Sequence, residues 1–247
     1  MVINPPMKEQ IGDWALIHQT ESWGLQLNPQ QISQLERYFE RLYETNQQFN
    51  LTRVPPHQAV GRHGIDSLCL LAVASLPQNA RVLDIGAGAG LPGIPLAIAR
   101  PDLQMTLLDS HAKSVRFLEQ VCSELGLNAI AIHARAEEWA HNPAVREQFD
   151  VVVARAVAKM PILAELMVPF LKVGGVALAL KSANERDEIL NAHSTAQKLG
   201  GSLRLHEVSL QTEQGTLLRL IAEITKTHPT PKAYPRRWSL MTKQPLS

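Results

Sequence analysis

The sequence has few of the features that mark exported, membrane-bound or metal-binding proteins. Its only two cysteines in 247 residues, Cys69 and Cys122, lie in apolar helical patterns without a histidine or second thiol at metal-ligand spacing. No apolar run reaches the roughly 18 residues that a membrane span requires. The first residues lack the basic start and apolar stretch of a secretory signal. We therefore expect a cytoplasmic protein with two buried thiols, no membrane segment and no metal.

Overall charge and aromatic content give little sign of nucleic-acid binding. Aromatic residues make up 5% of the chain and the formal net charge is +1. The charge is uneven, however, because residues 226–247 contain five basic residues, no acidic one and four prolines. Proline disfavours helices and inner strands, so we predict an extended basic arm. A solvated terminus would explain the same composition.

Before residue 80 the pattern is helical. Asn28 and Pro29 are typical of an N-cap and a first helical position, and the apolar residues that follow repeat at helical spacing. A second helix is predicted where Ile65, Leu68 and Leu76 share one face. We expect a single structural domain with an N-terminal helical extension (1–80), a core (81–225) and a basic C-terminal tail (226–247).

From residue 81 onward, short apolar runs alternate with helical segments. This alternation is typical of an α/β fold with a parallel sheet and crossover helices on both faces. One crossover helix is expected to begin after Ser110 as N-cap and to end at Gly126. Two later segments flank Gly215 as a hairpin, which makes a mainly parallel seven-stranded sheet. The predicted strands span residues 81–86, 104–109, 129–133, 149–154, 176–181, 203–210 and 217–225.

The most informative segment is VLDIGAGAGLPGIPLAI at residues 82–98, in which a strand leads into a glycine-rich turn and then a helix. Glycines permit a tight reversal and let a cofactor approach the backbone. Asp84 at the strand end suits a cofactor with a cationic amino group, and Asp109 at the end of the next strand suits the hydroxyls of a ribose. We therefore predict an S-adenosylmethionine site that includes Gly86, Gly88 and Gly90. Gly88, Gly90 and Gly93 also fit the dinucleotide pattern G-x-G-x-x-G, and a purely structural turn is the third interpretation.

Several separated motifs resemble those of the bacterial 16S ribosomal RNA guanine-N7 methyltransferases, the glucose-inhibited division protein B family. They are FNLTRV at 49–54, RHGIDS at 62–67, LDIGAGAGLPGIPLAI at 83–98, LLDSHAKSVRFL at 107–118, ARAEEW at 134–139, ARAV at 154–157 and ALKS at 179–182. The resemblance runs from about residue 23 to 225 and implies a Rossmann-like, S-adenosylmethionine-dependent methyltransferase. The tail departs from the family's frequent YPRKxGTPxKxPL ending, because it lacks the glycine and carries Trp238.

The resemblance also implies roles for particular residues. Gly86 and Leu91 would line the cofactor, Asp109 would hold its ribose, and Ala136 with Glu137 would flank its adenine. Arg155 would lie where the methyl group meets the guanine, close to the cofactor. We expect five residues to contact RNA. Arg62, His63 and Lys181 would lie near the entrance to this site, and Arg236 and Arg237 lie in the basic tail. Simpler interpretations are loop carboxylates for Asp84 and Asp109, a solvated helix start for Glu137, and an Arg155 paired with Asp84 or Asp150.

The predicted chemistry needs no general base. Guanine N7 has a free lone pair and no proton, so catalysis would consist mostly of holding two reactants in line. Arg155 could orient the base through O6, and Asp66 is the candidate carboxylate for stabilising the positive charge on the purine. The expected partner is small-subunit ribosomal RNA or the small subunit, bound by a monomer. Two rivals are a methyltransferase for another RNA, a protein or a small molecule, and a non-catalytic RNA-binding assembly factor.

Overall fold

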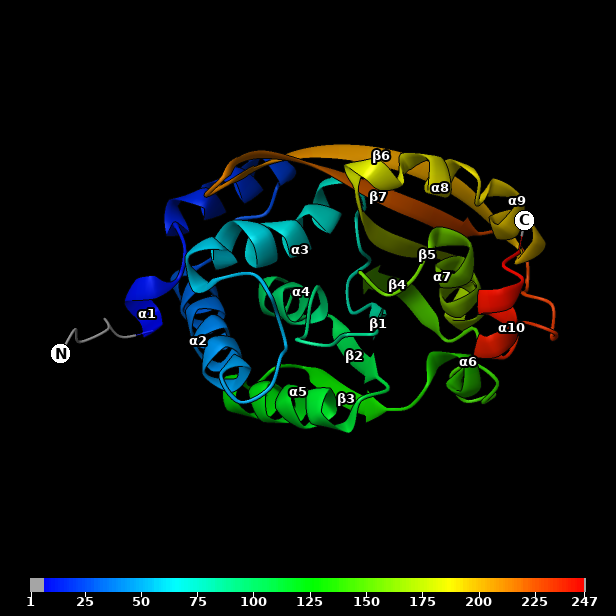
Figure 1. The fold of residues 1–247 in the computed structure, drawn as a ribbon, viewed down its shortest axis with the longest axis horizontal. Coiled ribbons are helices and arrows are strands. Elements are labelled where there is room, and N and C mark those ends of the chain that lie inside the picture. Colours follow the sequence, from blue (N-terminus) through cyan, green and yellow to red (C-terminus); the bar gives the residue numbers. More distant parts are fainter. Residues whose placement is uncertain (1–6, 247) are drawn as a thin grey trace.

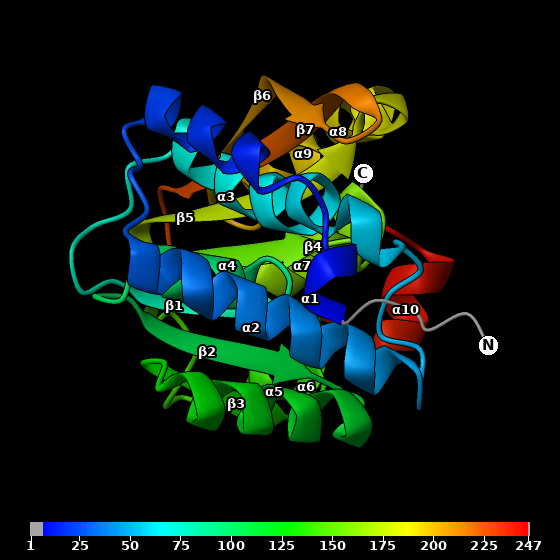
Figure 2. The same cartoon turned by 90° about the vertical axis from the view of Figure 1, so that its left-hand side faces the viewer.

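A seven-stranded sheet in the order β3-β2-β1-β4-β5-β7-β6 forms the centre of the computed structural model, which describes residues 7–246 (Figures 1 and 2). The first five strands in this order are parallel, and β7 is antiparallel to both of its neighbours. The strands are β1 (Arg81–Ile85), β2 (Gln104–Asp109), β3 (Ala129–His133), β4 (Phe149–Arg155), β5 (Leu171–Ser182), β6 (Gly201–Thr212) and β7 (Gly215–Lys226). The predicted α/β class and the mainly parallel seven-stranded sheet are confirmed.

Helices cover both faces of the sheet, as Figure 1 shows. Alternate strand residues point to opposite faces, so Val82 and Val151 pack with α2, α4 and α5, whereas Leu83 and Val152 pack with α7 and α9. The helices are α1 (Met7–Gln10), α2 (Pro29–Asn46), α3 (Asp66–Leu68), α4 (Gly93–Ala99), α5 (Ala112–Leu125), α6 (Ala136–Trp139), α7 (Met160–Met167), α8 (Arg186–Leu190), α9 (His193–Lys198) and α10 (Trp238–Lys243). Tighter or wider helical turns are η1 (Trp14–Trp23), η2 (Pro56–Gln58), η3 (Val60–Ile65), η4 (Cys69–Ala72), η5 (Val168–Phe170) and η6 (Ala183–Glu185).

Two of the three helix ends predicted from the sequence are confirmed. The cap of α2 is confirmed, because the Asn28 side chain accepts from the Gln31 amide while the Gln31 side chain accepts from Asn28. Gly126 ends α5 with a φ of 61°, as expected. Ser110 is not the cap of α5. His111 holds that position, and the carboxylate of Asp109 accepts from its backbone amide.

The predicted second N-terminal helix is wrong as a continuous element. Residues 56–72 form four consecutive short pieces, and η3 is a π-helix, a wider turn that often occurs at functional sites. The segment packs tightly against the β6–β7 hairpin, since a Cβ on Gly61 would lie 2.9 Å from the Cα of Thr212. Cys69 and Cys122 are buried and free, as predicted.

The prediction of an extended basic arm is also wrong. The tail contains α10, and Lys226 is buried with its ammonium 2.7 Å from the Glu147 carboxylate. The Arg146 guanidinium donates to the carbonyl oxygens of Tyr234 and Thr230, so the tail is bound along its length to the core. The prolines limit regular structure in the tail to one short helix, but they do not prevent the tail from packing on the core. Among residues 7–246, no helix combines the length and apolar character that crossing a bilayer would require. The division of the chain at residues 80 and 225 stays a prediction.

Candidate functional site

Two adjoining pockets lie at the carboxyl ends of the parallel strands, where ligands bind in open α/β sheets. The "glycine-loop cleft", of about 410 Å³, is lined by Ile85, Gly86, Leu108, Asp109, Ser110, His111, Ala134, Arg135, Ala136, Glu137, Ala156, Val157, Leu166 and Trp238. The "arginine pocket", of about 450 Å³, is lined by Val54, Arg62, His63, Asp66, Arg155, Ala156, Val157, Ala158, Leu180, Lys181, Ser182, Glu185 and Arg219. Ala156 and Val157 belong to both, so a group bound in one pocket would lie next to a group bound in the other.

The backbone of the glycine loop explains the choice of residue there. Gly86, Gly88 and Gly90 have φ angles of 67°, 53° and 92°, a region that side chains with a Cβ rarely adopt. At Gly86 space is also restricted, because a Cβ would lie 2.7 Å from a methyl group of Val157. Any substitution at Gly86 would therefore push into the wall that the two pockets share.

Asp109 fixes the far side of this loop. One carboxylate oxygen accepts from the Gly88 amide at 2.8 Å, and the other accepts from the His111 amide at 2.7 Å. The side chain is buried in the protein but lines the glycine-loop cleft. Each carboxylate oxygen can accept more than one hydrogen bond, so Asp109 can still receive hydroxyl groups from a ligand.

Asp84 has an unusual environment at the end of β1. Its side chain is fully buried, and its Oδ2 accepts from the Gly93 amide at 2.8 Å. Its Oδ1 is buried without a hydrogen-bond partner among the described residues. Burial raises the pKa of Asp84 to about 7, although the Gly93 amide and the positive charge of Arg155 act in the opposite direction. An unpartnered carboxylate oxygen in this position fits a cationic ligand group.

The structure brings only part of the predicted cofactor set onto the cleft wall. Gly86, Asp109, Ala136 and Glu137 line it, and Glu137 also accepts from the Arg135 guanidinium at 2.7 Å. The remaining members are not lining residues: Asp84 and Leu91 are buried, Gly88 and Gly90 shape the loop, and Arg155 lines the arginine pocket.

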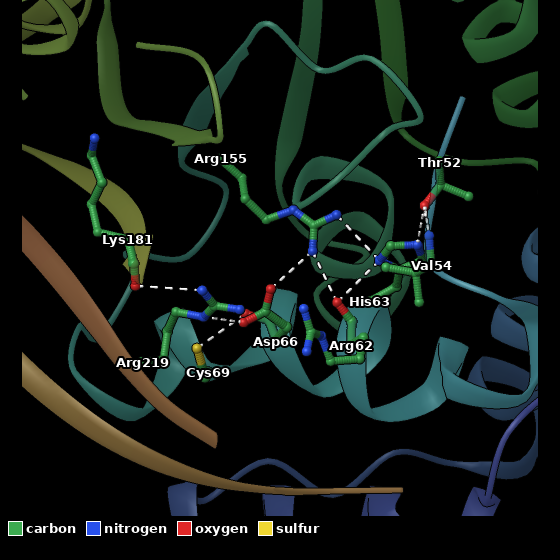
Figure 3. A network of polar contacts seen from close by, with 9 residues as sticks. All are labelled: Thr52, Val54, Arg62, His63, Asp66, Cys69, Arg155, Lys181 and Arg219. Atoms are coloured by element: carbon green, nitrogen blue, oxygen red, sulfur yellow. Dashed lines mark hydrogen bonds and ion pairs between the residues drawn. The ribbon is translucent and has the colours of Figure 1, made fainter. Parts of the chain in front are cut away.

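The arginine pocket is organised around Asp66 (Figure 3). Its side chain is 2% exposed, and one oxygen lies 2.9 Å from Arg155 Nη1 while the other lies 2.5 Å from Arg219 Nε. Arg155 comes from the end of β4 and Arg219 from β7. A single carboxylate therefore joins two strands that β5 separates in the sheet. The sequence-based alternatives for the partner of Arg155, Asp84 and Asp150, are wrong. Asp150 accepts from the ammonium of Lys172 instead.

His63 is held neutral beside Arg155. Burial and the positive charge of Arg155 lower the pKa of His63 to about 3. The Nδ1 of His63 lies 3.2 Å from Arg155 Nη2, and its Nε2 lies 2.8 Å from Thr52 Oγ1. The same Nδ1 lies 3.0 Å from the carbonyl oxygen of Arg62, which also accepts from Arg155 Nη1. The contact with Thr52 holds the imidazole ring in place, and Nδ1 faces the Arg155 guanidinium.

The remaining predicted RNA-binding residues lie in different settings. Lys181 lines the pocket but its ammonium binds Glu185, Glu188 and the Ala158 carbonyl, and Figure 3 shows it pointing away from Asp66. Arg62 lines the pocket too, whereas Arg236 and Arg237 line neither pocket. Arg236 is paired with Glu165, and Arg237 is exposed at the start of α10. Arg219 was missed, because only the pairing of β5 with β7 places it opposite Ser182.

Comparison with known proteins identifies the family of the chain. The family model described as rRNA small subunit methyltransferase G matches residues 31–216. A protein of that name from Geobacillus thermodenitrificans is 42% identical over 92% of this chain and 95% of its own length. Its counterpart from Halalkalibacterium halodurans is 41% identical over 92% and 96%.

A solved structure provides a separate comparison of the fold. The YcgJ protein of Bacillus subtilis superposes with a TM-score of 0.51 and 15% identity, covering 67% of this chain and all of that one. At that identity the likeness concerns the fold alone. The family is assigned from the family model, which matches most of the sheet, and from the two relatives that are more than 40% identical. This chain belongs to the rRNA small subunit methyltransferase G family.

Proposed function

We propose that this protein transfers a methyl group from S-adenosylmethionine to N7 of a guanine in small-subunit ribosomal RNA. The observation that carries the proposal is the shared wall of Ala156 and Val157 between the glycine-loop cleft and the arginine pocket. A donor in the first and a base in the second would be neighbours. The family membership of the chain supports the same reaction.

The residues around the glycine-loop cleft fit the methyl donor. We assign the ammonium group to the unpartnered oxygen of Asp84, which is buried behind the cleft wall, and the ribose hydroxyls to the carboxylate of Asp109 on that wall. Ala136 and Glu137 line the part of the cleft that we assign to the adenine. When bound, the donor supplies an activated methyl group on a sulfonium. The protein's contribution is to hold that sulfur toward the shared wall.

The arginine pocket fits a guanine that needs no deprotonation. N7 attacks with a free lone pair, and the pocket offers no free base because His63 is neutral and hydrogen-bonded at both ring nitrogens. Arg155 donates to O6 and keeps N7 free for the methyl group. Asp66 acts by positioning, since both of its oxygens bind arginines. Holding the reactants in line can supply roughly 7 to 11 kcal/mol of the barrier.

The substrate is a guanine in an accessible strand. Within a paired stem N7 lies in the deep groove of A-form RNA, which side chains do not enter, so a loop or splayed nucleotide is required. Arginines rather than aromatic rings surround the pocket, and binding to RNA therefore weakens as salt rises. We further propose that the protein acts as a monomer, which light scattering of the free protein tests.

Nucleoside mass spectrometry tests the reaction directly. Small subunits from cells that lack the protein are incubated with it and S-adenosylmethionine, and 7-methylguanosine in the ribosomal RNA is measured. The expected result is one modified guanine per subunit, modification about 10³-fold slower with Arg155→Ala, and full modification with Lys172→Gln, a cation paired with Asp150 outside both pockets. Methyl transfer to metabolites but not RNA, or binding of subunits without any transfer, would reject the proposal.

A further inference from the structure

The C-terminal tail is attached firmly next to the glycine-loop cleft. The Arg236 guanidinium meets the carboxylate of Glu165 with Nε–Oε1 at 2.8 Å and Nη2–Oε2 at 2.7 Å. Glu165 is fully buried in α7, so this two-pronged ion pair is shielded from water. The backbone amide of Arg236 donates to the same carboxylate at 2.7 Å. The chain just before α10 is therefore fixed to the core.

Apolar packing holds α10 itself in place. Met241 is fully buried and packs on Ile162 and Leu166 of α7, with Ala136 and Val157 at the edge of the same cluster. Figure 1 shows α10 beside α6 and α7, far in the sequence from both. Three of these contact residues, Ala136, Val157 and Leu166, also line the glycine-loop cleft. The tail and the cleft thus share one wall.

Trp238, the first residue of α10, forms part of that wall. It lines the cleft together with Ala136 and Glu137, the residues assigned to the adenine. Its side chain is 36% exposed, although it is held by a packed helix, so one part of the indole is free to receive a ligand. Among the described lining residues it is the only one with a large aromatic ring. The cleft also contains aliphatic side chains such as Ile85 and Leu108, so an exposed indole beside them suits a flat, partly apolar ligand group.

We infer that Trp238 is a cofactor-binding residue, whose indole stacks on the adenine of the methyl donor. The inference rests on the proposed function, and it adds the C-terminal tail to the donor site. Stacking of a base on an aromatic side chain is typically worth about 1 to 3 kcal/mol. Arg236 and Met241 act through Trp238 by fixing the helix that presents it. The donor site is therefore completed by a segment more than 70 residues after Arg155.

Calorimetry with S-adenosylhomocysteine, the demethylated product, tests the inference without catalysis. Trp238→Ala is expected to weaken binding by about 10- to 100-fold, as loss of one base–aromatic stack predicts. Trp238→Phe retains a ring and is expected to stay within about fivefold of the wild type. The matched control is Leu240→Ala, on the same helix, 41% exposed and outside the cleft, which is expected to bind as the wild type does.

Fluorescence gives a second measurement. The chain has four tryptophans, and the change in emission on binding S-adenosylhomocysteine is expected to be largely lost in Trp238→Phe. Unchanged affinity in a folded Trp238→Ala, or an effect confined to the KM for ribosomal RNA, would overturn the inference and leave the proposed reaction standing. Failure of the wild type to bind S-adenosylhomocysteine would instead remove the proposed function.

Discussion

The two pockets that meet at Ala156 and Val157 are built in different ways. The glycine-loop cleft is lined by the ends of β1 and β2, by the residues that follow these strands, β3 and β4, and by one residue each of α7 and α10. Amides of the glycine loop and of the start of α4 align the carboxylates of Asp109 and Asp84 next to it. The arginine pocket is made from side chains of η3, α3, β4, β5 and β7, joined through Asp66. One pocket depends on backbone conformation and the other on tertiary contacts between charges.

This difference separates the expected roles of the two pockets. The methyl donor is the same molecule in every reaction. Backbone amides and buried carboxylates suit such a ligand, because these protein groups hardly change position. Long arginine side chains suit a flat acceptor that has to be oriented through its edge. Substitutions in the arginine pocket should therefore reduce transfer without affecting the donor, and substitutions in the cleft should act on donor affinity.

The strongest test of this separation is Arg155→Ala. Loss of the group that orients the guanine is expected to reduce single-turnover methyl transfer by about 10³-fold, the upper range for removing one positioned donor. Affinity for S-adenosylhomocysteine, measured by calorimetry, is expected to stay within about threefold, because Arg155 does not line the cleft.

Arg155→Lys sharpens the same comparison. It keeps the positive charge but loses the planar fork, so we expect transfer between the rates of the wild type and of Arg155→Ala. Equal losses of donor affinity and transfer rate in both variants would show that Arg155 belongs to the donor site, and would contradict the separation of roles.

The next largest effect is expected for Asp66→Asn, on folding. This change leaves Arg155 and Arg219 close together without a balancing negative charge, and breaking such a pair typically costs about 3 to 5 kcal/mol. Urea unfolding is expected to show a loss of about 3 kcal/mol in the free energy of unfolding.

A double variant separates charge from packing. Because Asp66→Asn with Arg219→Gln removes one of the two unbalanced charges, it should recover part of the lost stability. If Asp66→Asn alone unfolds within about 0.5 kcal/mol of the wild type, the pocket does not depend on this charge balance.

The contrast between the pockets also explains what the sequence could predict. Strand ends, the glycine turn, Asp84 and Asp109 follow from local rules, because apolar periodicity and glycine conformations act over a few residues. Asp66 and Arg155 were identified as members of one site through motifs that lie far apart. Their direct pairing was not predicted, since nothing within either motif specifies which carboxylate a distant guanidinium will meet.

Three features could not be predicted from the sequence, because each depends on contacts between segments that lie far apart in the chain. Arg219 lies in a strand whose pairing with β5 sets its position, and register is a tertiary property. The π-helix at Val60–Ile65 depends on packing against the β6–β7 hairpin. The tail was read as an extended arm because its prolines and positive charges suggest a solvated chain, while Glu165 and Glu147, which neutralise two of those charges, lie elsewhere in the sequence.

The titration of Asp84 predicts how the affinity for the methyl donor changes with pH. A carboxyl with a pKa of about 7 is mostly protonated at pH 5 to 6, and must lose that proton before it can pair with the ammonium of the donor. Donor affinity is therefore expected to rise about tenfold per pH unit between pH 5 and 7 and to level off above 7. Calorimetry in buffers of different ionisation enthalpy should detect the released proton.

Asp84→Asn is the matched control for that measurement. Its amide oxygen can still accept from Gly93, so the loop is preserved while the titrating group is removed. The variant is expected to bind weakly at every pH, without the rise between pH 5 and 7. A wild-type affinity that does not change over this range would mean that Asp84 does not meet the ammonium group.

The smallest expected effect concerns Arg62, which differs from the other arginines of its pocket. The carbonyl of Arg62 accepts from Arg155, but its guanidinium has no hydrogen bond or ion pair within residues 7–246 (Figure 3). An unpaired guanidinium at the mouth suits a phosphate, which gives affinity without selecting a base. Arg62→Gln is expected to raise the KM for ribosomal RNA about three- to fivefold and to reduce the salt slope of binding by about one, with the rate at saturation preserved. A lower rate at saturating RNA would instead place Arg62 with Arg155, as a group that contacts the reacting base.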